Sequence, residues 1–187
     1  MTTSQERTQL LQIAREAIMA HVTGVAGVTG GALAAADRTD LSVRRGGVFV
    51  SLHKHGQLRG CIGHLESDDS LIRVVARCAV AACSADPRFP PVAPGELRQL
   101  QVELSVLGPL EPAAGPADIE IGRHGLLVEM GRQRGLLLPQ VAAEQQWDAQ
   151  TFLGQTCRKA GLPEDSWQRG GSVEVWRFEA EVFADLL

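Results

Sequence analysis

The segment Leu58-Arg59-Gly60-Cys61-Ile62-Gly63 lies at the centre of the pattern that decides the fold. It follows an apolar run, Gly47-Val48-Phe49-Val50-Ser51-Leu52, and a polar stretch, His53-Lys54-His55-Gly56-Gln57. Two strand-like segments joined by a short turn that contains glycine predict a β-hairpin. This hairpin puts Cys61 in its second strand, with Gly60 before it and Gly63 after it.

The setting of Cys61 has two interpretations. Glycines beside a thiol either permit a positive φ or let another backbone or a ligand come close, and Arg59 is a cation that favours a thiolate. Alternatively, Cys61 is a small core residue and the glycines mark a β-bulge. The residues alone favour the structural interpretation, because structural causes of unusual motifs are common.

The rest of the chain alternates helical and strand-like periods. A capping box at Thr3 and Glu6 predicts a helix that ends near Gly24. An irregular connection is expected over residues 24–36 and a polar turn over 37–47. Apolar residues at helical spacing predict a helix over 71–82, and alternating residues predict a half-buried strand over 100–107 with Glu103 facing outward. A hairpin over 126–138, a helix capped by Asp148 and ended by Gly161, and a strand over 172–183 follow. Paired strands on short turns predict an α+β fold with a largely antiparallel sheet and flanking helices.

Length and composition limit the class of protein. The chain of 187 residues is expected to form a single domain over residues 1–187, and the Pro/Gly-rich loop at 108–117 is where a small subdomain would begin. The net charge of −4 argues against a surface that coats nucleic acid. No apolar run is long enough to span a bilayer, and no signal peptide is evident.

Cysteine spacing and glycine-rich motifs limit the cofactors. The four cysteines match no zinc or C-x-x-C spacing, so we expect reduced thiols in a cytoplasmic protein. The sequence contains no phosphate-binding glycine loop and no three-cysteine radical-enzyme motif. We therefore expect neither a nucleotide nor an iron–sulfur cluster, and the sequence assigns no cofactor.

The segment 58–63 resembles LRGCIG, the signature of the AMMECR domain family, whose prokaryotic members are called AmmeMemoRadiSam system protein A. The similarity runs from about residue 47 to the C-terminus, in family order. Its other blocks are Val50–Lys54, Asp86–Val92, Glu103–Leu107, Ile121–Leu126, Leu137–Val141 and Lys159–Pro163. The resemblance strengthens the functional interpretation of Cys61 but supplies no reaction, because the chemistry of the family is not settled.

His124 is the second candidate residue, since Gly122-Arg123-His124-Gly125 repeats the glycine-and-arginine setting of Cys61. An imidazole is the usual partner of a reactive thiol, so we expect Cys61 and His124 to pair as catalytic residues. The alternative is a turn histidine bonded to a backbone carbonyl. The binding residues expected in the same cleft are Arg59, Gly60, Gly63, Asp86, Arg88 and Gln140. Arg88, held between Pro87 and Phe89, suits either an anion or a structural salt bridge.

A metal site near Cys61 is a weaker alternative. His53 and His55 would share one strand face if the strand ran through both, and His64 is close in sequence. A Cys/His set of this kind suits zinc or iron. However, His55 falls in the expected turn and His64 lies outside the family signature, so no metal site is predicted.

Two functions of different classes follow. The first is a cysteine-dependent enzyme that acts on a small molecule or a modified residue in a cleft around Cys61. The second is a non-catalytic binding or partner subunit. The resemblance implies two kinds of partner for such a subunit. The family is associated with Memo-type proteins, which look like metal-dependent dioxygenases, and also with radical S-adenosylmethionine enzymes.

Overall fold

The computed structural model describes residues 2–25, 41, 46–169 and 172–187. The chain divides into two compact units, one formed by Met1–Leu107 with Glu181–Leu187 and the other by Gly108–Ala180. The irregular connection expected over residues 24–36 and the turn expected over 37–47 lie mostly outside the described residues.

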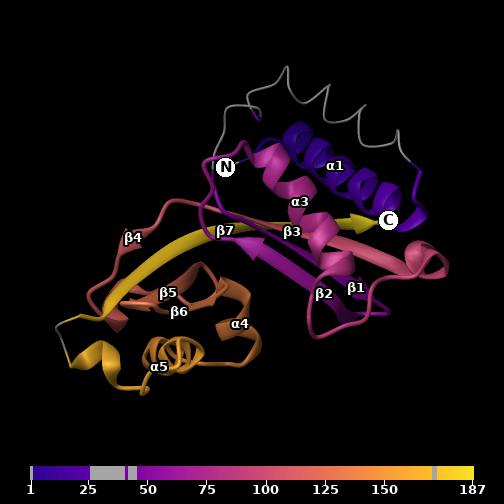
Figure 1. The fold of residues 1–187 in the computed structure, drawn as a ribbon. Coiled ribbons are helices and arrows are strands. Elements are labelled where there is room, and N and C mark those ends of the chain that lie inside the picture. The colour runs from indigo at the N-terminus through magenta and orange to yellow at the C-terminus, as the bar shows by residue number, and fades with distance from the viewer. Residues whose placement is uncertain (1, 26–40, 42–45, 170–171) are drawn as a thin grey trace. The chain divides into compact units, whose positions relative to one another are not determined.

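The first unit contains the predicted hairpin. Strands β1 (Val48–Lys54) and β2 (Gln57–His64) pair antiparallel, and β3 (Leu100–Leu107) pairs antiparallel with the other edge of β1 (Figure 1). The order is β2-β1-β3, followed by β7 (Glu174–Leu186), whose last residues belong to this unit. Strand β2 is therefore an edge strand.

Two helices pack on one face of these strands. Helix α1 (Ser4–Thr23) has the predicted capping box at Thr3 and ends at Gly24, and α3 (Leu71–Ser84) presents an apolar face to β1 and β2. The 3₁₀ helix η2 (Pro94–Gln99) precedes β3. Alternate strand residues form the core with the helices: Val48, Val50, Leu52, Leu100, Val102 and Leu104, all buried. The residues between them lie on the opposite face of the sheet.

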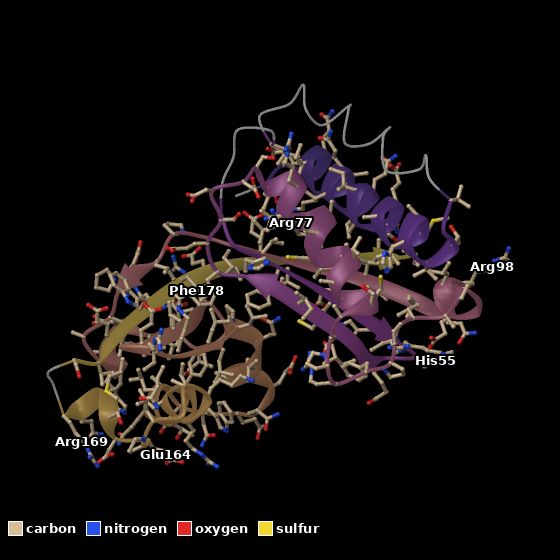
Figure 2. All side chains as sticks on the ribbon, viewed as in Figure 1. His55, Arg77, Arg98, Glu164, Arg169 and Phe178 are labelled. Atoms are coloured by element: carbon tan, nitrogen blue, oxygen red, sulfur yellow. The ribbon has the colours of Figure 1, made fainter. Side chains whose placement is uncertain are left out.

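The turn of the hairpin is tighter than the sequence predicted. Strand β1 continues through Lys54, and only His55 and Gly56 form the turn, with φ values of 52° and 75°. Two consecutive positive φ angles are typical of a type I′ turn, whose twist matches that of the strands. His55 lies at this tip (Figure 2), so it does not share a strand face with His53.

The second unit has its own strands, helices and core. Its elements are β4 (Glu111–Pro112), η3 (Pro116–Asp118), β5 (His124–Met130), β6 (Gln133–Leu137), α4 (Pro139–Glu144), α5 (Ala149–Lys159), η4 (Ser166–Gln168) and the first residues of β7. Strands β4 and β5 both pair antiparallel with β7, and β5 pairs antiparallel with β6. The side chain of Asp148 caps α5, as predicted. These pairings confirm the α+β prediction with a largely antiparallel sheet. No helix among the described residues is long and apolar enough to cross a membrane.

Gly60 and Gly63 are explained by close packing, because neither has a positive φ. A Cβ atom on Gly60 would overlap the carbonyl oxygen of Ala82 in α3, and one on Gly63 would overlap the ring of Phe49. The register also shifts beside Gly60, because Leu52 pairs with Gly60 while the next residue of β1 pairs with Leu58. A register shift therefore lies where the structural interpretation placed a β-bulge, and the atoms that approach the glycines belong to the protein.

Gly60→Ala is expected to lower the free energy of unfolding by about 2 kcal/mol, because helix backbone must move to admit the methyl group. Gly95→Ala is the matched control, since its Cβ meets nothing within 4 Å and its φ is not in the positive range. Urea unfolding of both variants measures the difference. An equal effect of the two substitutions would contradict the packing explanation.

Candidate functional site

Cys61 lies on the face of the sheet opposite the helices. It pairs with Ser51 of β1, and the Ser51 hydroxyl donates a hydrogen bond of 3.2 Å to the Cys61 sulfur. Cys61 is partly exposed, whereas Cys78, Cys83 and Cys157 are buried. A half-exposed thiol with a polar partner is the state that allows reaction.

Three strands bring further polar groups to the same face. Ser51 pairs with Cys61 on one side and with Glu103 of β3 on the other. His53 follows Ser51 by two residues along β1, so its side chain points to the same face. The distance from His53 Nε2 to Glu103 Oε1 is 3.9 Å, and within the described part of the chain this buried nitrogen has no hydrogen-bond partner. A thiol, a hydroxyl, an imidazole and a carboxylate therefore share one surface.

These four groups have complementary chemistry. Diagonal neighbours on paired strands lie about 7–8 Å apart, within reach of long side chains, and His53 is diagonal to Cys61. An imidazole can accept the proton of a thiol, and the Glu103 carboxylate would stabilise the resulting imidazolium. The Ser51 hydroxyl, already donating to the sulfur, would stabilise a thiolate in the same way.

The backbone of Cys61 is held by an ion pair between the buried Asp86 and the half-exposed Arg88. Because β2 is an edge strand, the N–H and C=O groups of Cys61 can point away from β1. The N–H donates to Asp86 Oδ2 at 2.8 Å, and the carbonyl accepts from Arg88 Nη2 at 3.2 Å. Arg88 also donates to both carboxylate oxygens of Asp86, at 2.9 and 2.6 Å. We call Asp86 and Arg88 the edge clamp.

The edge clamp is strongly ionic. The Asp86 side chain is only 2 % exposed, and its hydrogen bonds with Arg88 hold the pKa of the carboxyl group well below the ordinary value. The same bonds raise the pKa of Arg88, with a further contribution from Cys61. The Arg88 guanidinium lies over the ring of Phe89, 5.4 Å from its centroid. Of the two roles that the sequence allowed for Arg88, the structure contains the salt bridge.

The other cysteines are poor nucleophiles. Burial raises the pKa of Cys78 and of Cys83 to about 11, and it also raises the pKa of Cys157. Each of these thiols is therefore protonated near neutral pH.

Arg59 forms hydrogen bonds to the loop of residues 90–96, which follows the edge clamp in sequence. Its guanidinium donates to both carboxylate oxygens of Glu96, at 3.2 and 3.0 Å, and to the carbonyl oxygen of Pro90 at 2.8 Å. Lys54 donates to Glu96 as well, at 2.9 Å. These contacts lower the pKa of Glu96 to about 2, with Arg59 as the main cause. Arg59 thus fixes the loop against β2.

His124 and Gln140 belong to the second unit. The Nδ1 atom of His124 accepts a hydrogen bond of 3.0 Å from the backbone N–H of Glu120, whereas the alternative considered from sequence was a bond to a carbonyl. The Oε1 atom of Gln140 is buried and has no partner among the described residues. The pairing of Cys61 with His124 stays a prediction.

The residues that surround Cys61 were only partly expected. Ser51, Glu103 and His53 were not predicted as its partners, and His53 was considered only as a metal ligand. Strand alternation was the available signal, since Ser51 and His53 are two residues apart and Glu103 is expected on the outer face of its strand. Within the described residues, no group of three His, Cys, Asp or Glu side chains is placed to hold a metal ion.

Asp86→Asn is expected to cost about 2 kcal/mol of stability at pH 7, because it removes the charge-assisted hydrogen bonds that Arg88 donates to this carboxylate. A carboxyl group whose pKa is lowered by folding stabilises the protein above its unfolded pKa of about 3.9, and this stability is lost as the pH falls further. The penalty should therefore shrink between pH 5 and about pH 2. Urea unfolding across this range measures it, with the exposed Asp69→Asn as control. A penalty that does not change with pH would contradict the role of the ion pair.

Comparison with known proteins places the chain in a family. A family model described as AMMECR1 matches residues 11–183. A protein from Methanothermobacter thermautotrophicus is 47% identical over 184 residues, covering 95% of this chain and 93% of the relative, and one from Methanosarcina acetivorans is 42% identical over 190 residues, covering 99% and 94%. The crystal structure of the uncharacterized protein PH0010 from Pyrococcus horikoshii is similar with a TM-score of 0.82 and 39% identity, covering 94% of this chain and 89% of that one. The chain belongs to the AMMECR1 family.

Proposed function

We propose that this AMMECR1-family protein is a cysteine-dependent enzyme that uses Cys61 to attack an electrophilic carbon of a small molecule or a modified residue. The observation that carries the proposal is the hydrogen bond from Ser51 to the Cys61 sulfur, on a sheet face that also holds His53 and Glu103. The burial of the other three cysteines supports the choice of Cys61.

The proposed reaction has two steps. In the first, the thiol proton of Cys61 moves to the imidazole of His53, the sulfur forms a bond to the substrate carbon, and the leaving group departs with that proton. In the second step, water attacks the same carbon, the carbon–sulfur bond breaks, and the sulfur regains a proton. Glu103 stabilises the imidazolium between the proton transfers, and Ser51 supports the anionic sulfur.

The edge clamp has a positioning role in this mechanism. Asp86 and Arg88 hold the N–H and C=O groups of the nucleophile's own residue, so they fix the backbone from which the sulfur projects. A nucleophile on a strand fixed on both sides is preorganised, which lowers the entropy that the reaction must lose.

Site-resolved alkylation tests the proposal. Iodoacetamide at pH 7, followed by peptide mass spectrometry, should modify Cys61 before Cys78, Cys83 or Cys157. Because exposure alone would give this order, the decisive comparison is His53→Asn, which should slow Cys61 alkylation about tenfold, equivalent to ~1.4 kcal/mol. His55→Asn, at the turn tip, is the matched control and should have no effect. His124→Asn tests the partner predicted from sequence in the same assay.

An acyl probe separates catalysis from mere reactivity. The wild-type protein should release one equivalent of p-nitrophenol per chain from p-nitrophenyl acetate in a burst, and Cys61→Ser should abolish the burst. No burst, together with alkylation insensitive to both His53→Asn and His124→Asn, would rule out the enzyme. The alternative function, a non-catalytic partner subunit for Memo-type or radical S-adenosylmethionine proteins, would then be favoured.

A further inference from the structure

Ser105 of β3 carries a buried hydroxyl group that has no hydrogen-bond partner among the described residues. The residue is only 1% exposed. A buried hydroxyl that stays unpaired costs free energy, so nearly all such groups in folded proteins bind either another protein atom or an ordered water. An ordered water is therefore the partner expected for Ser105.

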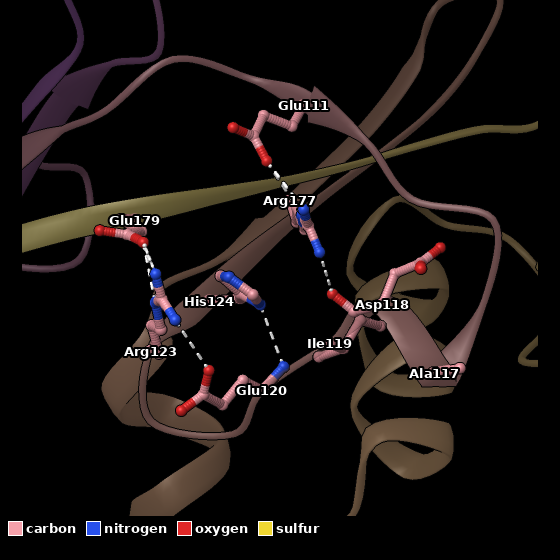
Figure 3. A pocket seen from close by; sticks show the side chains of 9 residues that line it. All are labelled: Glu111, Ala117, Asp118, Ile119, Glu120, Arg123, His124, Arg177 and Glu179. Carbon is pink, nitrogen blue, oxygen red and sulfur yellow. Dashed lines mark hydrogen bonds and ion pairs between the residues drawn. The ribbon is translucent and has the colours of Figure 1, made fainter.

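The polar groups that line an open hollow in the second unit differ from Ser105 in this respect. Arg123 donates to Glu179 at 2.8 Å, and the two lie side by side in Figure 3. Arg177 donates to Glu111 at 2.9 Å in the same hollow. These charged groups are already paired with one another, whereas the hydroxyl of Ser105 is buried and unpaired.

Ser105 lies on the same face of the sheet as Cys61. Ser51 pairs with Glu103 of β3, and Ser105 follows Glu103 by two residues along that strand. Side chains two residues apart in a strand point to the same face, so Ser105 is a diagonal neighbour of Ser51. Ser51 is buried as well, at 7% exposed. Two buried hydroxyl groups and a carboxylate therefore lie together beside the thiol.

The spacing of the two hydroxyl groups matches one bridging water. Diagonal neighbours on paired strands lie about 7–8 Å apart, which is too far for the short side chains of Ser51 and Ser105 to bond directly. A water that forms two hydrogen bonds of about 2.8 Å spans a gap of ~5 Å between two oxygens. Buried waters form about three hydrogen bonds, and the Glu103 carboxylate supplies the third partner.

The donors and acceptors around such a water balance. The Ser51 hydroxyl donates its one proton to the Cys61 sulfur, so its oxygen acts as an acceptor toward the water. The Glu103 carboxylate is also an acceptor, and Ser105 is a donor. The water thus accepts from Ser105 and donates to Ser51 and to Glu103, and each proton is used once.

We propose that Ser51, Glu103 and Ser105 bind one water, which keeps the Ser51 proton on the Cys61 sulfur. Ser51 lies between Cys61 and Glu103, and an ionised carboxylate is a stronger acceptor than sulfur. Because the water donates to both Ser51 and Glu103, the Ser51 hydroxyl does not turn toward the carboxylate. Ser105 is therefore a positioning residue for the thiol. Its importance for catalysis rests on the proposed function, whereas the water site itself does not.

The pH dependence of Cys61 alkylation by iodoacetamide tests the proposal. Ser105→Ala removes the donor that holds the water, so the midpoint of the rate profile should move upward by about 0.5 pH unit, the size of one weakened hydrogen bond. Ser166→Ala, which removes a buried hydroxyl from the second unit, is the matched control and should leave the midpoint unchanged.

A double-mutant cycle separates this role from a general loss of packing. Glu103→Gln weakens the acceptor that competes for the Ser51 proton, so in that background Ser105→Ala should move the midpoint less than it does alone. A high-resolution crystal structure of the wild-type protein should contain one water within hydrogen-bond distance of both Ser51 Oγ and Ser105 Oγ.

Three results would each overturn the proposal. They are a crystal structure without a water between the two serines, equal midpoints for Ser105→Ala and Ser166→Ala, and an equal effect of Ser105→Ala with and without Glu103→Gln. The absence of a p-nitrophenol burst would refute the enzyme alone, because the alkylation profile and the crystal structure require no turnover.

Discussion

The buried carboxylate of Asp86 is the group on which the Cys61 site depends. It accepts from the backbone N–H of Cys61 and from Arg88, so it joins the loop after α3 to the edge strand β2. A carboxylate buried to this extent is stable only because each of its oxygens has donors. Together with the hydrogen bond from Arg88 to the Cys61 carbonyl, these contacts satisfy the outward backbone groups of Cys61, at an edge that could otherwise pair with another strand.

Most of the fold could be predicted from local patterns. The apolar periodicity of α3 and the cap at Asp148 each depend on residues within one element, and both predictions were confirmed. The strand β3 was also confirmed, but its alternation of buried and exposed residues ends at Leu104, because Ser105 is buried as well. The hairpin was also predicted, but the extent of its turn was not. His55 takes a positive φ of 52°, and nothing in its residue type requires that conformation.

The candidate site was harder to predict because it depends on strand register. Ser51 meets both Cys61 and Glu103 only because β1 lies between β2 and β3 in one register, and β3 comes about 50 residues later in the chain. A shift of one residue would turn His53 or Cys61 to the helix-covered face. Arg59 was expected near the Cys61 thiol because it precedes Cys61 by two residues. Its guanidinium instead binds Glu96 and the carbonyl oxygen of Pro90.

Gly60 shows how a glycine can act on a reactive residue without touching a ligand. Its missing side chain lets the last turn of α3 approach β2 at Ala82, and α3 ends two residues later. The chain then reaches Asp86 close enough to the edge strand for its carboxylate to accept from Cys61. Any side chain at Gly60 would push this end of the helix outward and would carry the edge clamp away with it. The glycine, the helix end and the ion pair therefore act together to fix the position of one thiol.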